Sequence, residues 1–260
     1  MLIAADSGNT ADVEAWLNAG NDVNDVCADP YQEWTLLLVC VNSGQTRTAS
    51  HIALTRLLLE RGANVNVVCL DQGSEMHILN MNCDNIDTAC LEVASLLLES
   101  GANVNARSRV SEDEPYETSL GIVLDEFRKN GPSEDSNLRA QLVTILLRAG
   151  ASLDNISDDG SAEDILRAAE TELPEVLRDD AFIAIRDLVA SVRAAGSWKA
   201  HCRLAHKQVL RLRSLVARGR AKLPRTRRPR GRDARALEFV VRQGDNGIVW
   251  HILSFWRETA

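Results

Sequence analysis

Histidine and cysteine are the residue types in this sequence that could hold a metal ion. His77, Cys83 and Cys90 follow one another at intervals of six and seven residues, which matches no common zinc pattern. Cys202 and His206 are four residues apart, so both can point from one face of a helix, but two ligands do not complete a site. We therefore expect no metal site, and we interpret His77 as a structural residue that hydrogen-bonds to a neighbouring turn.

Acid–base chemistry would need paired carboxylates, and the sequence contains two such clusters, Glu112-Asp113-Glu114 and Asp158-Asp159. Carboxylates act as catalysts only in a cleft that shifts their pKa values. Both clusters lie in stretches that we interpret as exposed loops, where these groups are simply solvated. The sequence also lacks the GxSxG, HExxH, P-loop and GxGxxG patterns. We expect no catalytic residue, no cofactor and no enzymatic activity.

The charges of the chain are divided between two parts. Residues 1–196 carry 13 Lys+Arg against 33 Asp+Glu, a net charge of −20, and residues 197–260 carry 16 against 4, a net charge of +12, which together give −8. A reversal of this size predicts a boundary between two units near residue 196. The acidic part argues against nucleic acid as its own ligand, whereas the basic part leaves phosphate binding open.

The composition indicates the broad class of protein. A content of 45% hydrophobic and 25% charged residues is typical of a soluble, folded chain, and only 4% aromatic residues favours a core of close-packed helices. No apolar run reaches the roughly 18–20 residues of a membrane helix. The start of the sequence has no secretory pattern, and none of the six cysteines forms a CxxC pair. We expect a reduced, intracellular, cytoplasmic protein without a membrane partner.

One sequence pattern recurs four times and predicts the ends of four helices. The strings at 62–66 and 101–105 are identical, Gly-Ala-Asn-Val-Asn, and each follows a Leu-Leu-Leu-Glu run. Looser copies occur at 16–24 and 145–154. Each apolar run would close a helix, and its glycine would supply the left-handed residue that ends it.

These helix ends resemble those of the ankyrin-repeat family, whose unit of about 33 residues is a β-turn finger followed by two antiparallel helices. The Thr-Pro-Leu-His opening of the family has weaker counterparts that begin at Thr35, Ser74 and Thr118. The repeat glycines lie 42, 39 and 49 residues apart, so the loops are expanded. The resemblance implies an all-α solenoid of paired antiparallel helices, with about five degenerate repeats over residues 1–196.

The period is lost in residues 197–260, which we interpret as a basic helical unit that caps the solenoid. An Arg-rich linker is expected at about 224–233, followed by short helices at 234–241 and 248–256. The segment 248–255 is similar to part of an F-box, and Ser214-Leu215 is similar to the start of a SOCS-type box. Either resemblance would imply a second hypothesis, a substrate adaptor of a ubiquitin ligase.

The favoured hypothesis is a non-catalytic scaffold that binds a protein partner through its fingers and concave face, as the ankyrin resemblance implies. The carboxylates would steer a basic partner, and Tyr and Trp are the types that anchor interfaces. The expected partner-binding residues are Tyr31, Glu33, Trp34, Asp71, Glu75, Glu112, Asp113, Glu114, Tyr116, Asp158 and Asp159. Nucleic acid is not the expected partner, but phosphate contacts or nuclear import could involve Arg225, Arg227, Arg228, Arg230 and Arg232.

Overall fold

The computed structural model describes residues 1–29, 32–42, 48–67, 73–81, 86–108, 116–158 and 160–218. The chain divides into two compact units, Met1–Ala190 and Ser191–Ala260. The boundary therefore falls somewhat before residue 196, where the charge reversal predicted it, and it lies within a helix. Both units are mainly helical in their described parts, in agreement with the predicted all-α class.

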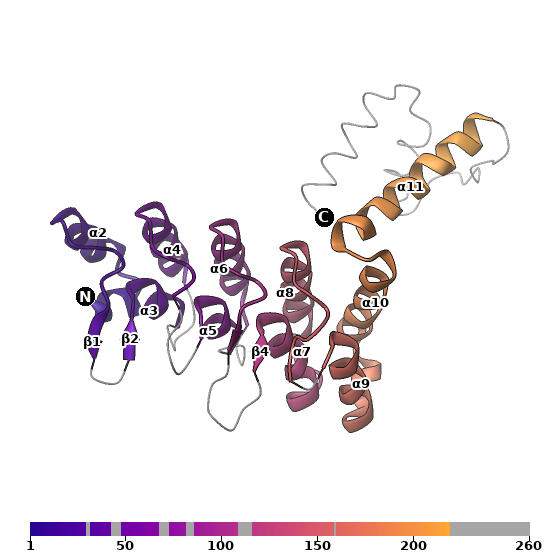
Figure 1. Cartoon of the computed structure of the whole chain (residues 1–260), viewed down its shortest axis with the longest axis horizontal. Helices are drawn as coiled ribbons and strands as arrows, with labels where there is room; N and C mark the ends of the chain where they lie inside the picture. The colour runs from indigo at the N-terminus through magenta and orange to yellow at the C-terminus, as the bar shows by residue number, and fades with distance from the viewer. Residues whose placement is uncertain are drawn as a thin grey trace. The chain divides into compact units, whose positions relative to one another are not determined.

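The helices of the first unit form two rows (Figure 1). One row contains the odd-numbered helices α1 (Leu2–Asp6), α3 (Leu36–Asn42), α5 (Glu75–Met81), α7 (Ser119–Asn130) and α9 (Ala162–Glu172). The other row contains α2 (Thr10–Asn18), α4 (Ala49–Glu60), α6 (Thr88–Glu99) and α8 (Ser136–Arg148). Each helix packs against the next member of its own row, and each of the first four odd helices also packs against the even helix that follows it. The core lies between the rows.

The core is built mainly from aliphatic side chains, in keeping with the low aromatic content of the sequence. Every residue of α3 from Leu36 to Val41 is buried, because this helix is packed against α1, α5 and α4. The largest fully buried side chains are Phe127 and Phe182, whose ring centroids lie 5.6 Å apart in an edge-on arrangement. Aliphatic side chains fill most of the remaining space.

The segments that join an even helix to the next odd helix, here called fingers, include two short antiparallel hairpins. Strand β1 (Cys27–Asp29) pairs with β2 (Gln32–Trp34), and β3 (Arg107–Ser108) pairs with β4 (Glu117–Thr118). The sequence pattern predicts only loops in these stretches. Thr35 and Thr118 then cap the helices that follow, since their hydroxyls accept the backbone N–H of Leu38 and Gly121 at 3.2 Å.

The predicted helix stops are confirmed. The four repeat glycines follow α2, α4, α6 and α8, and each has a positive φ between 86° and 96° that residues with a side chain rarely adopt. No atom outside the neighbouring residues lies within 4 Å of the place where their Cβ would be. Glycine is therefore needed here for its backbone conformation and not for a close contact.

Three asparagines that follow the first three stops connect successive helix pairs, and we call this set the asparagine ladder. The side-chain N–H groups of Asn24, Asn66 and Asn105 donate to the carbonyls of the next repeat glycine at 3.1–3.2 Å. Their side-chain oxygens accept a backbone N–H two residues after that glycine, at 2.7–2.8 Å. Each amide is thus used as donor and acceptor, which fixes the register between neighbouring even helices.

The end of the first unit and the start of the second are also helical. A short 3₁₀ helix, η2 (Pro174–Arg178), connects α9 to α10 (Asp180–Ala195), and α11 (Trp198–Ala217) follows Gly196, which has a φ of 82°. Within the second unit, Ser191 Oγ and His201 Nδ1 are 2.9 Å apart. None of the helices in the described part of the chain is long and apolar enough to span a bilayer. The Arg-rich linker at 224–233, the helices expected at 234–241 and 248–256, and the F-box-like segment lie outside the described residues.

The asparagine ladder generates a prediction about stability. Changing Asn66 to Ala removes a donor and an acceptor, so the free energy of unfolding should fall by about 1–2 kcal/mol in urea denaturation. Asn66→Asp keeps the acceptor but loses the N–H, and should cost at least part of that amount. The control is Asn18→Ala on the exposed end of α2, where no ladder bond is lost. Equal effects at positions 18 and 66 would contradict the role of the ladder.

Candidate protein-interaction surface

Three residues from two successive fingers are joined by charged hydrogen bonds, and we call them the Tyr116 clamp. Arg107 Nη2 donates to the carbonyl oxygen of Tyr116 at 2.9 Å and to Asp158 Oδ1 at 2.6 Å. The backbone N–H of Tyr116 donates to Asp158 Oδ2 at 3.0 Å. The N–H of Tyr116 and the Arg107 guanidinium hold the pKa of Asp158 below its usual value. The clamp therefore exists at neutral pH with a charged carboxylate.

The clamp fixes the backbone of Tyr116 on both sides while its side chain stays accessible. The residue is 43% exposed, and its N–H and carbonyl are both engaged by clamp residues. The bridge between Glu117 and Ser157, together with the 2.7 Å bond from Thr118 N–H to the carbonyl of Ile156, joins the same two fingers. An exposed aromatic residue with a fixed backbone loses little conformational entropy when it binds.

Two of the predicted partner-binding residues, Trp34 and Glu75, are buried, so these predictions are wrong. Trp34 is 9% exposed with a buried indole N–H, and Glu75 is fully buried as the first residue of α5. Both positions face the core because the odd helices begin inside the packed row. Glu75 directly follows Ser74, just as Leu36 follows Thr35 and Ser119 follows Thr118. All three second residues are buried, so alignment of these helix openings could have predicted the burial of Glu75.

The remaining predicted residues divide into described and undescribed positions. Tyr116 and Asp158 are exposed, and the clamp brings them together as described above. The backbone of Glu33 lies in β2 opposite Ala28. The others lie outside the described residues: Tyr31, Asp71, Glu112, Asp113, Glu114 and Asp159. Arg107 was missed by the sequence analysis, because its partner Asp158 is 51 positions away and no local pattern joins them.

A buried polar junction connects α5 to the finger that precedes α7. His77 Nδ1 lies 2.8 Å from Ser74 Oγ, and its Nε2 lies 3.0 Å and 3.2 Å from the carbonyl oxygens of Ala106 and Glu117. His77 therefore has the structural role that the sequence predicted. Burial lowers the pKa of His77, so the neutral ring is favoured. The side chain of Glu117 accepts a hydrogen bond from Ser157 Oγ at 3.2 Å.

Two carboxyl groups at this junction are costly to ionise. Burial raises the pKa of Glu75 to about 7, and within the described part of the chain neither of its side-chain oxygens has a hydrogen-bond partner. Burial, and then repulsion by Asp125, raise the pKa of Glu117 to about 7 against the weaker effects of Lys129, Ser157 and Arg128. Both groups are covered by protein, with Glu75 fully buried and Glu117 8% exposed.

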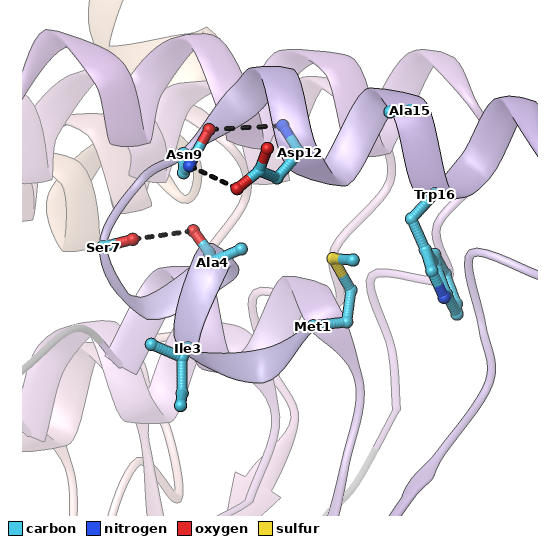
Figure 2. A pocket seen from close by; sticks show the side chains of 8 residues that line it. All are labelled: Met1, Ile3, Ala4, Ser7, Asn9, Asp12, Ala15 and Trp16. Atoms are coloured by element: carbon cyan, nitrogen blue, oxygen red, sulfur yellow. Dashed lines mark hydrogen bonds between the residues drawn. The ribbon is translucent and has the colours of Figure 1, made fainter.

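A hollow of about 600 Å³ lies between α1 and α2, lined mainly by apolar side chains (Figure 2). Met1 and Ile3 come from the first helix region, and Trp16 comes from α2. The carboxylate among its lining residues, Asp12, accepts a 2.7 Å hydrogen bond from the side chain of Asn9. Within the described residues, no group of three His, Cys, Asp or Glu side chains could hold a metal ion.

Comparison with known proteins gives no match, either among the models of protein families or among curated sequences.

The buried carboxyl of Glu75 predicts an unusual pH dependence. Its pKa is about 7 in the folded chain and about 4.5 in the unfolded chain, so the unfolded state loses its proton first as the pH rises. The free energy of unfolding is therefore highest below about pH 4.5. It falls by on the order of 3 kcal/mol as the pH rises through 7. Glu75→Gln should remove this loss when urea denaturation is compared from about pH 5 to about pH 8.

The neighbouring groups set the control for that experiment. His77 acts in the opposite direction, because its lowered pKa removes stability as the pH falls, and Glu117 acts in the same direction as Glu75. Both groups remain in the Glu75→Gln variant, so the difference between wild type and variant isolates Glu75. A difference that does not change with pH would show that the carboxyl is solvated and not buried.

Gly121 allows the next finger to approach α7, and this contact generates another prediction. It stands three residues after Thr118, as His77 stands three residues after Ser74, and an added Cβ would lie 2.6 Å from the carbonyl oxygen of Ile156. Gly121→Ala should therefore cost about 1–3 kcal/mol in thermal or urea unfolding. Alanine normally stabilises a helix relative to glycine, so a variant at least as stable as wild type would contradict the contact.

Proposed function

We propose that the first unit is a run of degenerate ankyrin repeats that binds a protein partner through its fingers and carries out no catalysis. Five features support the repeat assignment: the two helix rows, the glycine stops, the Thr caps, the asparagine ladder and the role of His77. Each recurs or connects neighbouring pairs, as expected of stacked units that bury a continuous core. The expanded loops then lengthen the fingers without changing the packing of the rows.

The observation that carries the binding proposal is the Tyr116 clamp. Interface energy is concentrated in a few residues, among which tyrosine is enriched, and a rigid anchor binds with a smaller entropy cost. Tyr116 combines an accessible ring with a backbone held by Arg107 and Asp158. The role of Asp158 is then to position Tyr116, which differs from the direct partner contact that the sequence suggested.

The charge of this part of the chain indicates the kind of partner. Residues 1–196 have a net charge of −20, and the finger before Tyr116 contributes Glu112, Asp113 and Glu114 to it. Such a surface attracts a basic protein and raises its rate of association at low salt. The proposed partner is therefore a basic protein segment that places an apolar or cationic side chain against the ring of Tyr116.

A site-specific crosslinking experiment tests the proposed surface. A photoreactive phenylalanine analogue at position 116, introduced into the full chain in cells, should form a discrete adduct with one partner. Leu177 in η2 provides the matched control, because it is also 43% exposed but lies outside the fingers. Asp158→Asn should weaken the adduct at 116, since it removes the charged acceptor of the clamp. The same adducts at 116 and 177, or none at 116, would contradict the proposal.

The purified partner permits a kinetic test of the charge argument. Changing Glu112, Asp113 and Glu114 to Lys should slow association at low salt by roughly tenfold or more, and the difference should shrink as salt rises. Helix content measured by circular dichroism should not change, because the three positions lie between α6 and α7 and outside both helices. The matched variant replaces Arg225, Arg227, Arg228 and Arg230 with Gln. An unchanged on-rate in the finger variant, with loss of binding in the arginine variant, would transfer the function to the second unit.

A further inference from the structure

Helix α11 in the second unit presents a row of exposed cations. Its sequence from Trp198 to Ala217 contains five Lys or Arg residues and no Asp or Glu. Lys199, Arg203, Lys207 and Arg211 are all exposed, and they follow one another at intervals of four residues. We call these four residues the cation stripe. Arg218, which is exposed directly after the helix, extends the row.

The spacing places the stripe on one side of the helix. Residues four apart are neighbours on a helix surface, and a turn of 100° per residue confines the four positions to a sector of about 120°. At 1.5 Å per residue the stripe is about 18 Å long, with one cation every 6 Å or so. Leu210 falls within this sector and is partly covered, His201 and Leu215 lie outside it and are partly covered, and Leu204 is exposed. The four exposed cations therefore form a nearly linear array along one side of α11.

The charges of the stripe are not neutralised within the described part of the chain. None of the ion pairs between described residues includes a member of the stripe. On an isolated helix such like charges repel one another at i,i+4 and reduce stability. A linear polyanion would remove this repulsion and would release its own condensed counterions.

We propose that the cation stripe of α11 binds the phosphate backbone of double-stranded nucleic acid without sequence specificity. A regular series of Lys and Arg suits a ligand whose charges also repeat regularly. A membrane surface fits less well, because an interfacial helix needs an open apolar face, and Leu204 is the large apolar residue of α11 found exposed among its described side chains. The sequence places no aromatic residue between Trp198 and Phe239, so base stacking on single strands has no platform there.

This function is compatible with the acidic first unit. At physiological ionic strength the screening length is about 8 Å, so the negative charge of residues 1–190 repels phosphates only at short range. The site is also separate from the Tyr116 clamp and does not depend on the proposed protein partner. The Arg-rich segment at 224–233 supplies a second group of cations in the same unit, and the experiment must distinguish it from the stripe.

The experiment measures fluorescence anisotropy of a labelled short DNA duplex with the full chain, from about 50 mM to about 200 mM salt. The stripe variant K199Q/R203Q/K207Q/R211Q removes four cations and keeps good helix formers. It should bind at least tenfold more weakly at low salt, and the slope of log K against log salt should decrease by about 3–4, since each phosphate contact contributes about 0.9. Circular dichroism checks that its helix content equals that of wild type.

The matched control, R225Q/R227Q/R228Q/R230Q, removes the same charge from the same unit and should change the slope less. No duplex binding by wild type, wild-type affinity in the stripe variant, or equal losses in the two variants would overturn the proposal.

Phosphatidylserine vesicles and poly-L-glutamate are tested in parallel. If vesicles bind through the stripe and DNA does not, the ligand is a membrane; if polyglutamate binds as tightly as DNA, the site lacks preference for phosphate. Either result would also overturn it.

Discussion

The backbone carbonyl at the end of each even helix is the group on which the register of the first unit depends. A left-handed glycine stops the helix and leaves its carbonyl without an intrahelical partner. Asn24, Asn66 and Asn105 each supply the missing N–H to the glycine of the next pair and accept a nearby backbone N–H in return. Neighbouring pairs are therefore held at one offset by the same chemistry.

This constraint explains how the loops can vary while the rows remain regular. The repeat glycines are separated by 42, 39 and 49 residues, yet α4 packs on α2, α6 on α4 and α8 on α6. Because the register is set at the helix ends, extra residues in a finger or between the two helices of a pair do not disturb it. Surface loops tolerate such insertions at a small entropy cost. The fingers are thus free to diverge, and one of them carries Tyr116.

Features that depend on local pattern could be predicted from the sequence, whereas features that depend on distant contacts could not. The glycine stops, the helices before them and the structural role of His77 follow from short motifs. The Arg107–Asp158 bond joins residues from two fingers, and no periodic pattern in the sequence predicts it. The prediction that Glu75 is exposed is wrong because a carboxylate is normally solvated, and only its offset from Ser74 shows that it enters the packed row. The strands could not be predicted because segments of two or three residues are too short to show hydrophobic alternation.

The ladder also determines where a second way of joining the pairs becomes necessary. Asp154 stands at the position of the ladder asparagines after Gly150, and a carboxylate has no N–H with which to bind a following carbonyl. The last two pairs are instead connected on the finger side. The carboxylate of Asp158 accepts hydrogen bonds from Arg107 and from the backbone N–H of Tyr116. The carbonyl of Ile156 accepts one from the backbone N–H of Thr118. The place where the even-row ladder ends is therefore the place where two fingers are locked together.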